Sequence, residues 1–167
     1  MRELELARAL VRRHEDFKPI VYDDATGKPI RAGSLVIGNP TIGIGRNLAS
    51  TGLSEPEAEM LNMNDLIRAA MGAEVWLGPS VWGDLNAARR AALIDFVFNV
   101  GLGTALEFKR TREAIACSDW QRAHDRLLES RYAEQVGKKP GQRAWRIARI
   151  LLTGGIEDEK DAETLLA

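Results

Sequence analysis

The chain has 167 residues, of which 45% are hydrophobic and 28% charged, which is typical of a globular protein with one domain and a substantial core. One cysteine and two histidines exclude an internal disulfide and any zinc site built from several cysteines or histidines. The formal net charge of −1 argues against a dedicated nucleic-acid-binding protein, because such proteins carry a strong basic excess.

The first segments predict a helix followed by a small antiparallel sheet. Apolar residues at three- and four-residue steps predict a helix over residues 3–16, and the helix must end before Pro19. Short apolar runs separated by turn residues then predict strands at residues 20–22, 34–37 and 41–44.

The rest of the chain predicts helices. Ser54 and Glu57 have the spacing of a capping box, which begins a long helix that runs to about residue 75. Residues 85–100 are apolar on almost every face from Ala91 onward, which is typical of a buried central helix.

Two further helices complete the predicted elements. A second capping box at residues 118–121 begins a helix that runs to about residue 133. A last helix is predicted over residues 141–152, and the run Thr-Gly-Gly at 153–155 ends it.

These elements predict an α+β protein that is mainly α-helical, with two lobes in one domain over residues 1–155. The predicted parts are a sheet lobe at 14–55, a connecting helix at 55–75, a helical lobe at 76–155 that also takes in helix 3–14, and an acidic tail at 156–167.

The charge is uneven along these parts. Residues 1–85 carry 9 basic and 12 acidic side chains, residues 86–155 carry 13 and 7, and residues 156–167 carry 1 and 5. The net charges are therefore −3, +6 and −4. We expect the basic region to attract an anionic polymer and the acidic tail to oppose that attraction.

Two carboxylates are the first candidates for chemistry. Glu15 lies at the end of the first predicted helix and Asp24 at the end of the first predicted strand. Hydrolysis of a glycosidic bond uses one protonated and one ionised carboxyl group across a cleft. Thr41 follows in a strand with two glycines, which indicates close approach of a ligand to the backbone. The alternative is that both acids are solvated surface groups.

Together these residues resemble a known signature. Glu15, then Asp24 after eight residues, and Thr41 in the run Thr-Ile-Gly-Ile-Gly resemble the phage-type lysozymes (endolysins) of glycoside hydrolase family 24, in their T-even-like form. The resemblance extends to about residue 155. It includes residues 85–101, Trp120, residues 130–132, and the segment from Arg143 to Gly154.

The resemblance implies a lysozyme-like fold and a muramidase that cleaves the β-1,4 bond between N-acetylmuramic acid and N-acetylglucosamine in peptidoglycan. Glu15 would be the general acid. Asp24 would stabilise positive charge and, with Thr41, position the attacking water in an inverting mechanism. No cofactor and no metal are implied.

The resemblance also implies substrate contacts and supporting residues. Phe98 could equally be a core residue, and for His14 a supporting or solvated role is favoured over that of an acid–base partner of Glu15. The implied substrate contacts are Asn47, Phe98, Asn99, Thr111 and Arg126. The implied supporting residues are Arg143, which would pair with Glu15, together with Arg146 and His14, and a structural ion pair between Arg46 and Asp65.

The largest departure from the family lies between Asp24 and Thr41. Sixteen residues intervene where the family signature has five. We expect the additional eleven, around Gly27 to Asn39, to form a longer hairpin that extends the sheet. This hairpin either reshapes access to the substrate or is a tolerated surface insertion.

The termini and the family suggest where the protein acts. The first residues contain no apolar run of a secretory signal, and no stretch reaches the ~20 apolar residues of a spanning helix. We therefore expect a monomer made in the bacterial cytoplasm, without membrane insertion or nucleic-acid binding. It would act on peptidoglycan in the periplasm after release by a partner such as a holin.

Three other functions remain open. A lytic transglycosylase would need the acid but no positioned water, so Asp24 and Thr41 argue against it. A catalytically inactive wall-binding or virion-associated protein would not need all three residues. A helical DNA-binding module would depend only on the arginines of residues 86–155.

Overall fold

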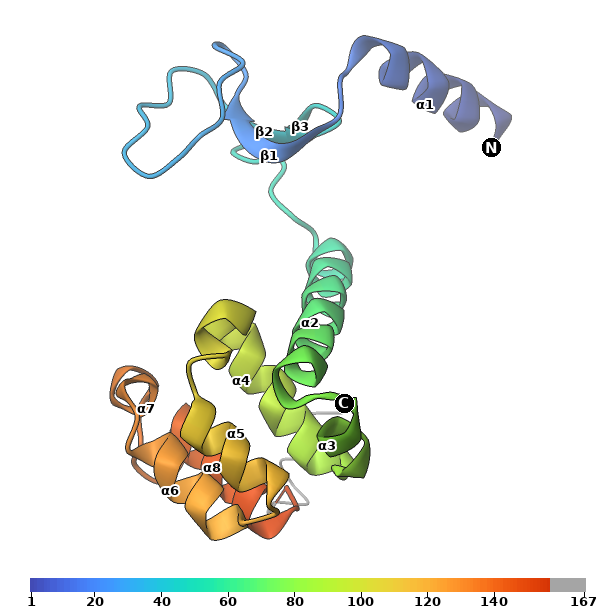
Figure 1. Cartoon of the computed structure of the whole chain (residues 1–167). Helices are drawn as coiled ribbons and strands as arrows, with labels where there is room; N and C mark the ends of the chain where they lie inside the picture. The colour runs from blue at the N-terminus through green and yellow to red at the C-terminus, as the bar shows by residue number, and fades with distance from the viewer. Residues whose placement is uncertain (157–167) are drawn as a thin grey trace. The chain divides into compact units, whose positions relative to one another are not determined.

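The computed structural model describes residues 1–156 and divides into two compact units, Met1–Glu59 and a second that begins at Met60 (Figure 1). Helices dominate, and the strands form one three-stranded antiparallel sheet, which confirms the predicted mainly helical α+β class. The predicted acidic tail at 156–167 lies outside the described residues except for its first residue. The predicted lobes, at 14–55 and at 76–155 together with helix 3–14, remain predictions.

The first unit consists of one helix, the sheet and the start of a second helix. The sheet has the order β1-β2-β3, and Tyr22 pairs with Thr41 and Asp23 with Pro40 across its first two strands. This register brings the end of β1 beside the start of β2. The elements are α1 (Arg2–His14), β1 (Lys18–Asp23), β2 (Pro40–Gly43) and β3 (Arg46–Asn47).

The predicted strand at residues 34–37, and with it the longer hairpin, is wrong. The segment between β1 and β2 is a loop without strands, joined to the sheet by one isolated bridge between Tyr22 and Pro29 (Figure 1). Leu35 and Ile37 are 86% and 72% exposed, so their apolar side chains pack on no surface. The Ile37 N–H, which a strand would use for pairing, is instead bound by the Asp23 carboxylate.

The second unit is helical and holds the hydrophobic core. Phe96 of α4 is fully buried, and its ring contacts the rings of Trp76, Phe108 and Tyr132. This confirms the predicted central helix, which begins at Ala87 and buries one face, including Leu93, Phe96 and Val97, but not every face. The elements are α2 (Glu55–Leu77), which begins in the first unit, α3 (Pro79–Asp84), α4 (Ala87–Ala105), α5 (Lys109–Ala116), α6 (Trp120–Leu128), α7 (Arg131–Val136) and α8 (Arg143–Thr153).

Several helix ends differ from the prediction. Asp119, not Ser118, caps α6 by accepting a hydrogen bond from the backbone N–H of Arg122. The predicted helix to residue 133 is interrupted because Ser130 caps a separate helix, α7. The predicted end of the last helix is confirmed, with Gly154 in the left-handed conformation.

No single helix among residues 1–156 has both the length and the apolar character needed to cross a membrane. The helices α4 and α5 meet those criteria only when taken together, and a bend of 118° separates them.

Candidate active site

Glu15 ends α1 and lies against the turn between β2 and β3. Its backbone is extended, and its N–H donates to the Val11 carbonyl at 2.8 Å, which closes the last turn of the helix. The side chain is exposed. A Cβ added to Gly45 would lie 3.0 Å from Oε2 of Glu15, and Gly45 has a φ of 70°. Glycine at this position therefore lets the carboxylate approach the strand turn closely.

Asp24 follows the last residue of β1, and Asn39 binds both of its carboxylate oxygens. The Asn39 N–H donates to Oδ1 at 2.6 Å, and the Asn39 side-chain amide donates to Oδ2 at 3.1 Å. These bonds, the backbone one foremost, lower the pKa of the Asp24 carboxyl below its ordinary value. Asp24 is therefore ionised at neutral pH.

Thr41 lies on β2 with only 4% of its surface exposed. Its hydroxyl donates to the Asn39 carbonyl at 3.3 Å. The same carbonyl accepts the Asp24 N–H at 3.1 Å. Asp24 and Thr41 thus both form hydrogen bonds with Asn39, a residue that the sequence analysis did not identify.

Asp23 is a second residue that the sequence analysis missed. It is 3% exposed, and its carboxylate accepts the backbone N–H groups of Ala25, Ile37 and Gly38 at 2.9–3.0 Å. These bonds, chiefly the one from Ile37, lower the pKa of Asp23. Asp23 therefore closes the base of the long loop beside Asp24. The adjacent pair of aspartates ahead of a turn was the available signal.

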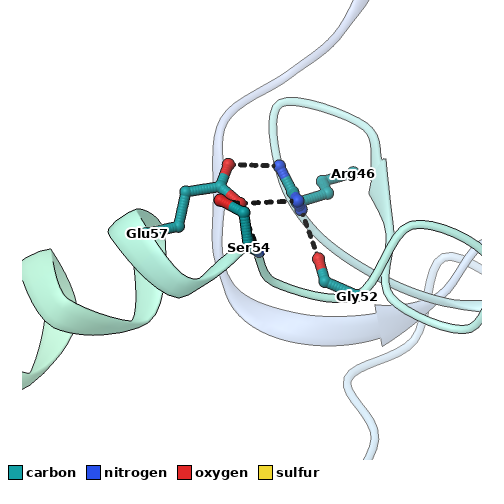
Figure 2. Close-up of polar contacts among 4 residues, drawn as sticks. All are labelled: Arg46, Gly52, Ser54 and Glu57. Carbon is teal, nitrogen blue, oxygen red and sulfur yellow. Dashed lines mark hydrogen bonds and ion pairs between the residues drawn. The ribbon is translucent and has the colours of Figure 1, made fainter.

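The predicted ion pair between Arg46 and Asp65 would join the two units and remains a prediction. Arg46 binds Glu57 through both terminal nitrogens, at 2.6 and 2.9 Å, and donates from Nε to the Gly52 carbonyl at 2.7 Å (Figure 2). Asp65 pairs with Arg68 on its own helix. The Glu57 carboxylate is also fixed by Ser54: it accepts the N–H and hydroxyl of Ser54 at 2.8 and 2.7 Å.

Two of the expected substrate contacts share a pocket in the second unit. The pocket has a volume of about 790 Å³, and both Thr111 and Arg126 line it. Thr111 is buried, and Arg126 forms an ion pair with Glu129 at 2.7 Å. The pocket is also lined by Val100, Thr104, Glu107, Phe108, Lys109, Arg110, Glu129, Ser130, Arg131, Tyr132 and Gln135.

The other expected substrate contacts have varied surroundings. Phe98 is 44% exposed on α4, which argues against the alternative that it is a core residue, and the neighbouring Asn99 is also exposed. In the first unit, the Asn47 side-chain oxygen accepts the N–H groups of Ala49 and Ser50. Asn47 therefore stabilises a turn after β3.

The supporting residues lie on helices of both units. Arg143, at the start of α8, binds the Asp95 carboxylate at 2.5 Å, and this bond raises the pKa of Arg143. Its expected pairing with Glu15 joins the two units and remains a prediction. His14 and Arg146 are exposed. Within residues 1–156, no group of three or more His, Cys, Asp or Glu side chains has an arrangement that could hold a metal ion.

Comparison with known proteins adds two findings. The phage lysozyme family model matches residues 12–148, a range that includes Glu15, Asp24 and Thr41. The pre-baseplate central spike protein Gp5 of Enterobacteria phage T4 is 27% identical over 164 residues, which covers 89% of this chain and 28% of that protein. The chain thus spans less than a third of the length of that relative.

Proposed function

Because the chain belongs to the phage lysozyme family, we propose that it is a peptidoglycan muramidase that uses Glu15, Asp24 and Thr41. The bond that it hydrolyses is the β-1,4 linkage between N-acetylmuramic acid and N-acetylglucosamine. The observation that carries the proposal is the cluster in the first unit, where Asp24 and Thr41 both contact Asn39.

The proposed chemistry divides the work between two carboxyl groups. Glu15 donates a proton to the glycosidic oxygen as the bond breaks. Asp24, whose pKa is lowered by Asn39, stays ionised and stabilises the positive charge that develops on the sugar ring. Asp24 and Thr41 hold a water for attack on the opposite face, which makes the reaction inverting.

The second unit would contribute to substrate binding. Thr111 and Arg126 line a pocket with several polar side chains, and Phe98 offers an exposed ring on which a sugar could stack. We propose these residues, with Asn99 and Asn47, as contacts to the glycan or its peptide. Arg143 and Arg146 would support the site from α8.

Loss of turbidity of outer-membrane-permeabilised Gram-negative cells tests the proposal. Glu15→Gln should reduce the lysis rate by about 10²–10⁴-fold, because it removes the proton donor. The matched control is Glu5→Gln, which makes the same change at an exposed position of α1 and should retain full activity. Equal lysis by wild type and Glu15→Gln, or no lysis by wild type, would contradict the proposal.

The products distinguish hydrolysis from transglycosylation. A hydrolase leaves reducing N-acetylmuramic acid ends, whereas a lytic transglycosylase leaves anhydro ends. We expect mass spectrometry of digested peptidoglycan to find reducing ends, because Asp24 and Thr41 are proposed to bind a water. Anhydro ends would contradict the hydrolytic mechanism, although peptidoglycan would still be the substrate.

Two biological settings fit this activity. As an endolysin, the chain would lyse its host from the periplasm after release by a partner such as a holin. The similarity to a phage spike protein favours a second candidate, a lysozyme carried in the virion. Mass spectrometry of purified phage particles separates them, since only the second predicts the chain in the particle.

A further inference from the structure

We propose that Asn39 is a positioning residue for the reaction, which sets the orientation of Asp24 and the hydrogen-bond direction of Thr41. The proposal rests on the muramidase function proposed above and adds to it a residue within the long Asp24–Thr41 segment. Asn39 is not proposed to contact the substrate.

The first argument is geometric. Asn39 donates to both Asp24 oxygens, from its backbone N–H at 2.6 Å and from its side chain at 3.1 Å. Rotation of the Asp24 side chain would break at least one of these bonds. A carboxylate has about four lone-pair positions, so each oxygen keeps capacity for a further hydrogen bond. Asp24 is therefore held in one orientation while remaining able to bind water.

The second argument concerns the single hydroxyl hydrogen of Thr41. Because that hydrogen is donated to the Asn39 carbonyl, the Thr41 oxygen offers only lone pairs to any other partner. A water between Thr41 and Asp24 would then donate one hydrogen to each of them. Its own lone pair would be left free to attack the sugar carbon. Asn39 thereby determines how the nucleophile is oriented.

The third argument is that Asn39 is itself held in place. Asp23 fixes the backbone N–H groups of Ile37 and Gly38 immediately before it, and Pro40 follows it in β2. A Cβ added to Gly38 would collide with Oδ1 of Asp24, so glycine permits this close approach. The segment that presents Asn39 is preorganised before substrate binds.

Asn39→Asp is the sharpest test, because it keeps the shape and backbone bonds of Asn39 and replaces only the side-chain donor. At neutral pH two carboxylates would face each other, and we expect kcat to fall by about tenfold or more. At lower pH the pair would share one proton, which restores a donor to Asp24. The pH of maximum kcat should therefore move downward, with little change in KM.

Asn39→Ala should move the pH dependence of kcat in the opposite direction. It removes one bond to the ionised form of Asp24, so the acidic limb of the kcat profile should move to higher pH. A ¹³C NMR titration of the Asp24 carboxyl should show the same upward shift and does not depend on activity. A residue that only anchored the loop would lower kcat equally at every pH.

Asn62→Asp is the matched control, because it makes the same amide-to-carboxylate change at an exposed position of α2. It should keep the wild-type pH profile. The proposal is overturned if both Asn39 variants keep that profile, or lose activity by one factor at every pH, while wild type is active. Failure of the muramidase proposal is distinguishable, since wild type itself would then show no lysis that depends on Glu15.

Discussion

Glu57 binds both terminal nitrogens of Arg46 with the same carboxylate that closes the first turn of α2 through Ser54. The Glu57 carboxylate thus binds both Ser54 and Arg46, and it joins β3 to the start of α2 (Figure 2). The bonds of Arg46 to Gly52 and Glu57 therefore hold the segment 48–54 between β3 and α2.

This relationship predicts a pH-dependent stability. The bonds from Ser54, followed by the charge of Arg46, lower the pKa of Glu57 in the folded state. Glu57 therefore stabilises the fold above the ordinary Glu pKa of about 4.3, and this contribution is lost as pH falls through the lowered value. Glu57→Gln should lower Tm at neutral pH and reduce the loss of Tm on acidification, as measured by circular dichroism.

Glu59→Gln is the control for this measurement, because Glu59 lies exposed on the same helix. It should leave the pH dependence of Tm unchanged. An unchanged pH dependence in Glu57→Gln as well would show that the carboxylate adds nothing to stability.

Gly45→Ala should impair catalysis more than Gly43→Ala. Both glycines have a φ near 70°, so an alanine costs similar backbone strain at each, about 1–2 kcal/mol. Only at Gly45 would the new methyl group press on Glu15, whereas nothing lies within 4 Å of the methyl group at Gly43. We expect kcat of Gly45→Ala to be about tenfold lower than kcat of Gly43→Ala. Equal kcat in two folded variants would contradict the contact between Gly45 and Glu15.

Asp23→Asn should loosen the loop between β1 and β2. An Asn side chain retains one acceptor oxygen and turns a donor toward backbone N–H groups, so the three bonds from Ala25, Ile37 and Gly38 cannot all remain. Limited trypsin digestion should then cleave after the exposed Arg31 several-fold faster. Asp16→Asn, at an exposed position, should cleave at the wild-type rate; equal rates in all three proteins would refute the role of Asp23.

Tyr132→Phe should stabilise the second unit. The Tyr132 hydroxyl is buried without a hydrogen-bond partner among the described residues, so its removal should raise the free energy of unfolding by about 1 kcal/mol. Denaturation by urea measures this change. A loss of stability would mean that the hydroxyl makes a bond in solution.

Burial also raises the pKa of Tyr132 to about 12. The folded state then keeps a proton that the unfolded state loses, so the free energy of unfolding is unaffected by this group below the ordinary pKa of about 10 and falls as pH rises from 10 toward 12. Ultraviolet titration of Tyr22→Phe, which leaves Tyr132 as the only tyrosine, should show no midpoint near 10 while the protein is folded.

The elements that the sequence predicted correctly depend on local patterns. The bond between the Glu57 carboxylate and the Ser54 N–H and the helix over most of residues 85–100 follow from neighbouring residues, and both are present. The strand at residues 34–37 failed because its pattern was apolar but had no partner strand. Its N–H groups near Ile37 were bound by a side chain from β1 instead.

The candidate site was predictable only in part, for a similar reason. Glu15, Asp24 and Thr41 were recognisable because their spacing resembles a family signature. Asn39 and Asp23 act through bonds across about fifteen residues, and no periodicity reports such contacts. The pairing of Arg46 with Glu57 was also missed, because it joins a strand to a helix eleven residues later and no periodicity reports it.

Asp23 and Asn39 close the loop between β1 and β2 at its base. The length of the loop therefore has little effect on the positions of the site residues. Its two ends are fixed to each other by bonds of the Asp23 and Asp24 carboxylates to residues 37–39, and residues 28–30 pair with β1. Each doubling of such a loop costs only about 0.6 kcal/mol of closure entropy. A change of length confined to the exposed residues 31–36 should therefore leave the bonds between Asp24 and Asn39 in place.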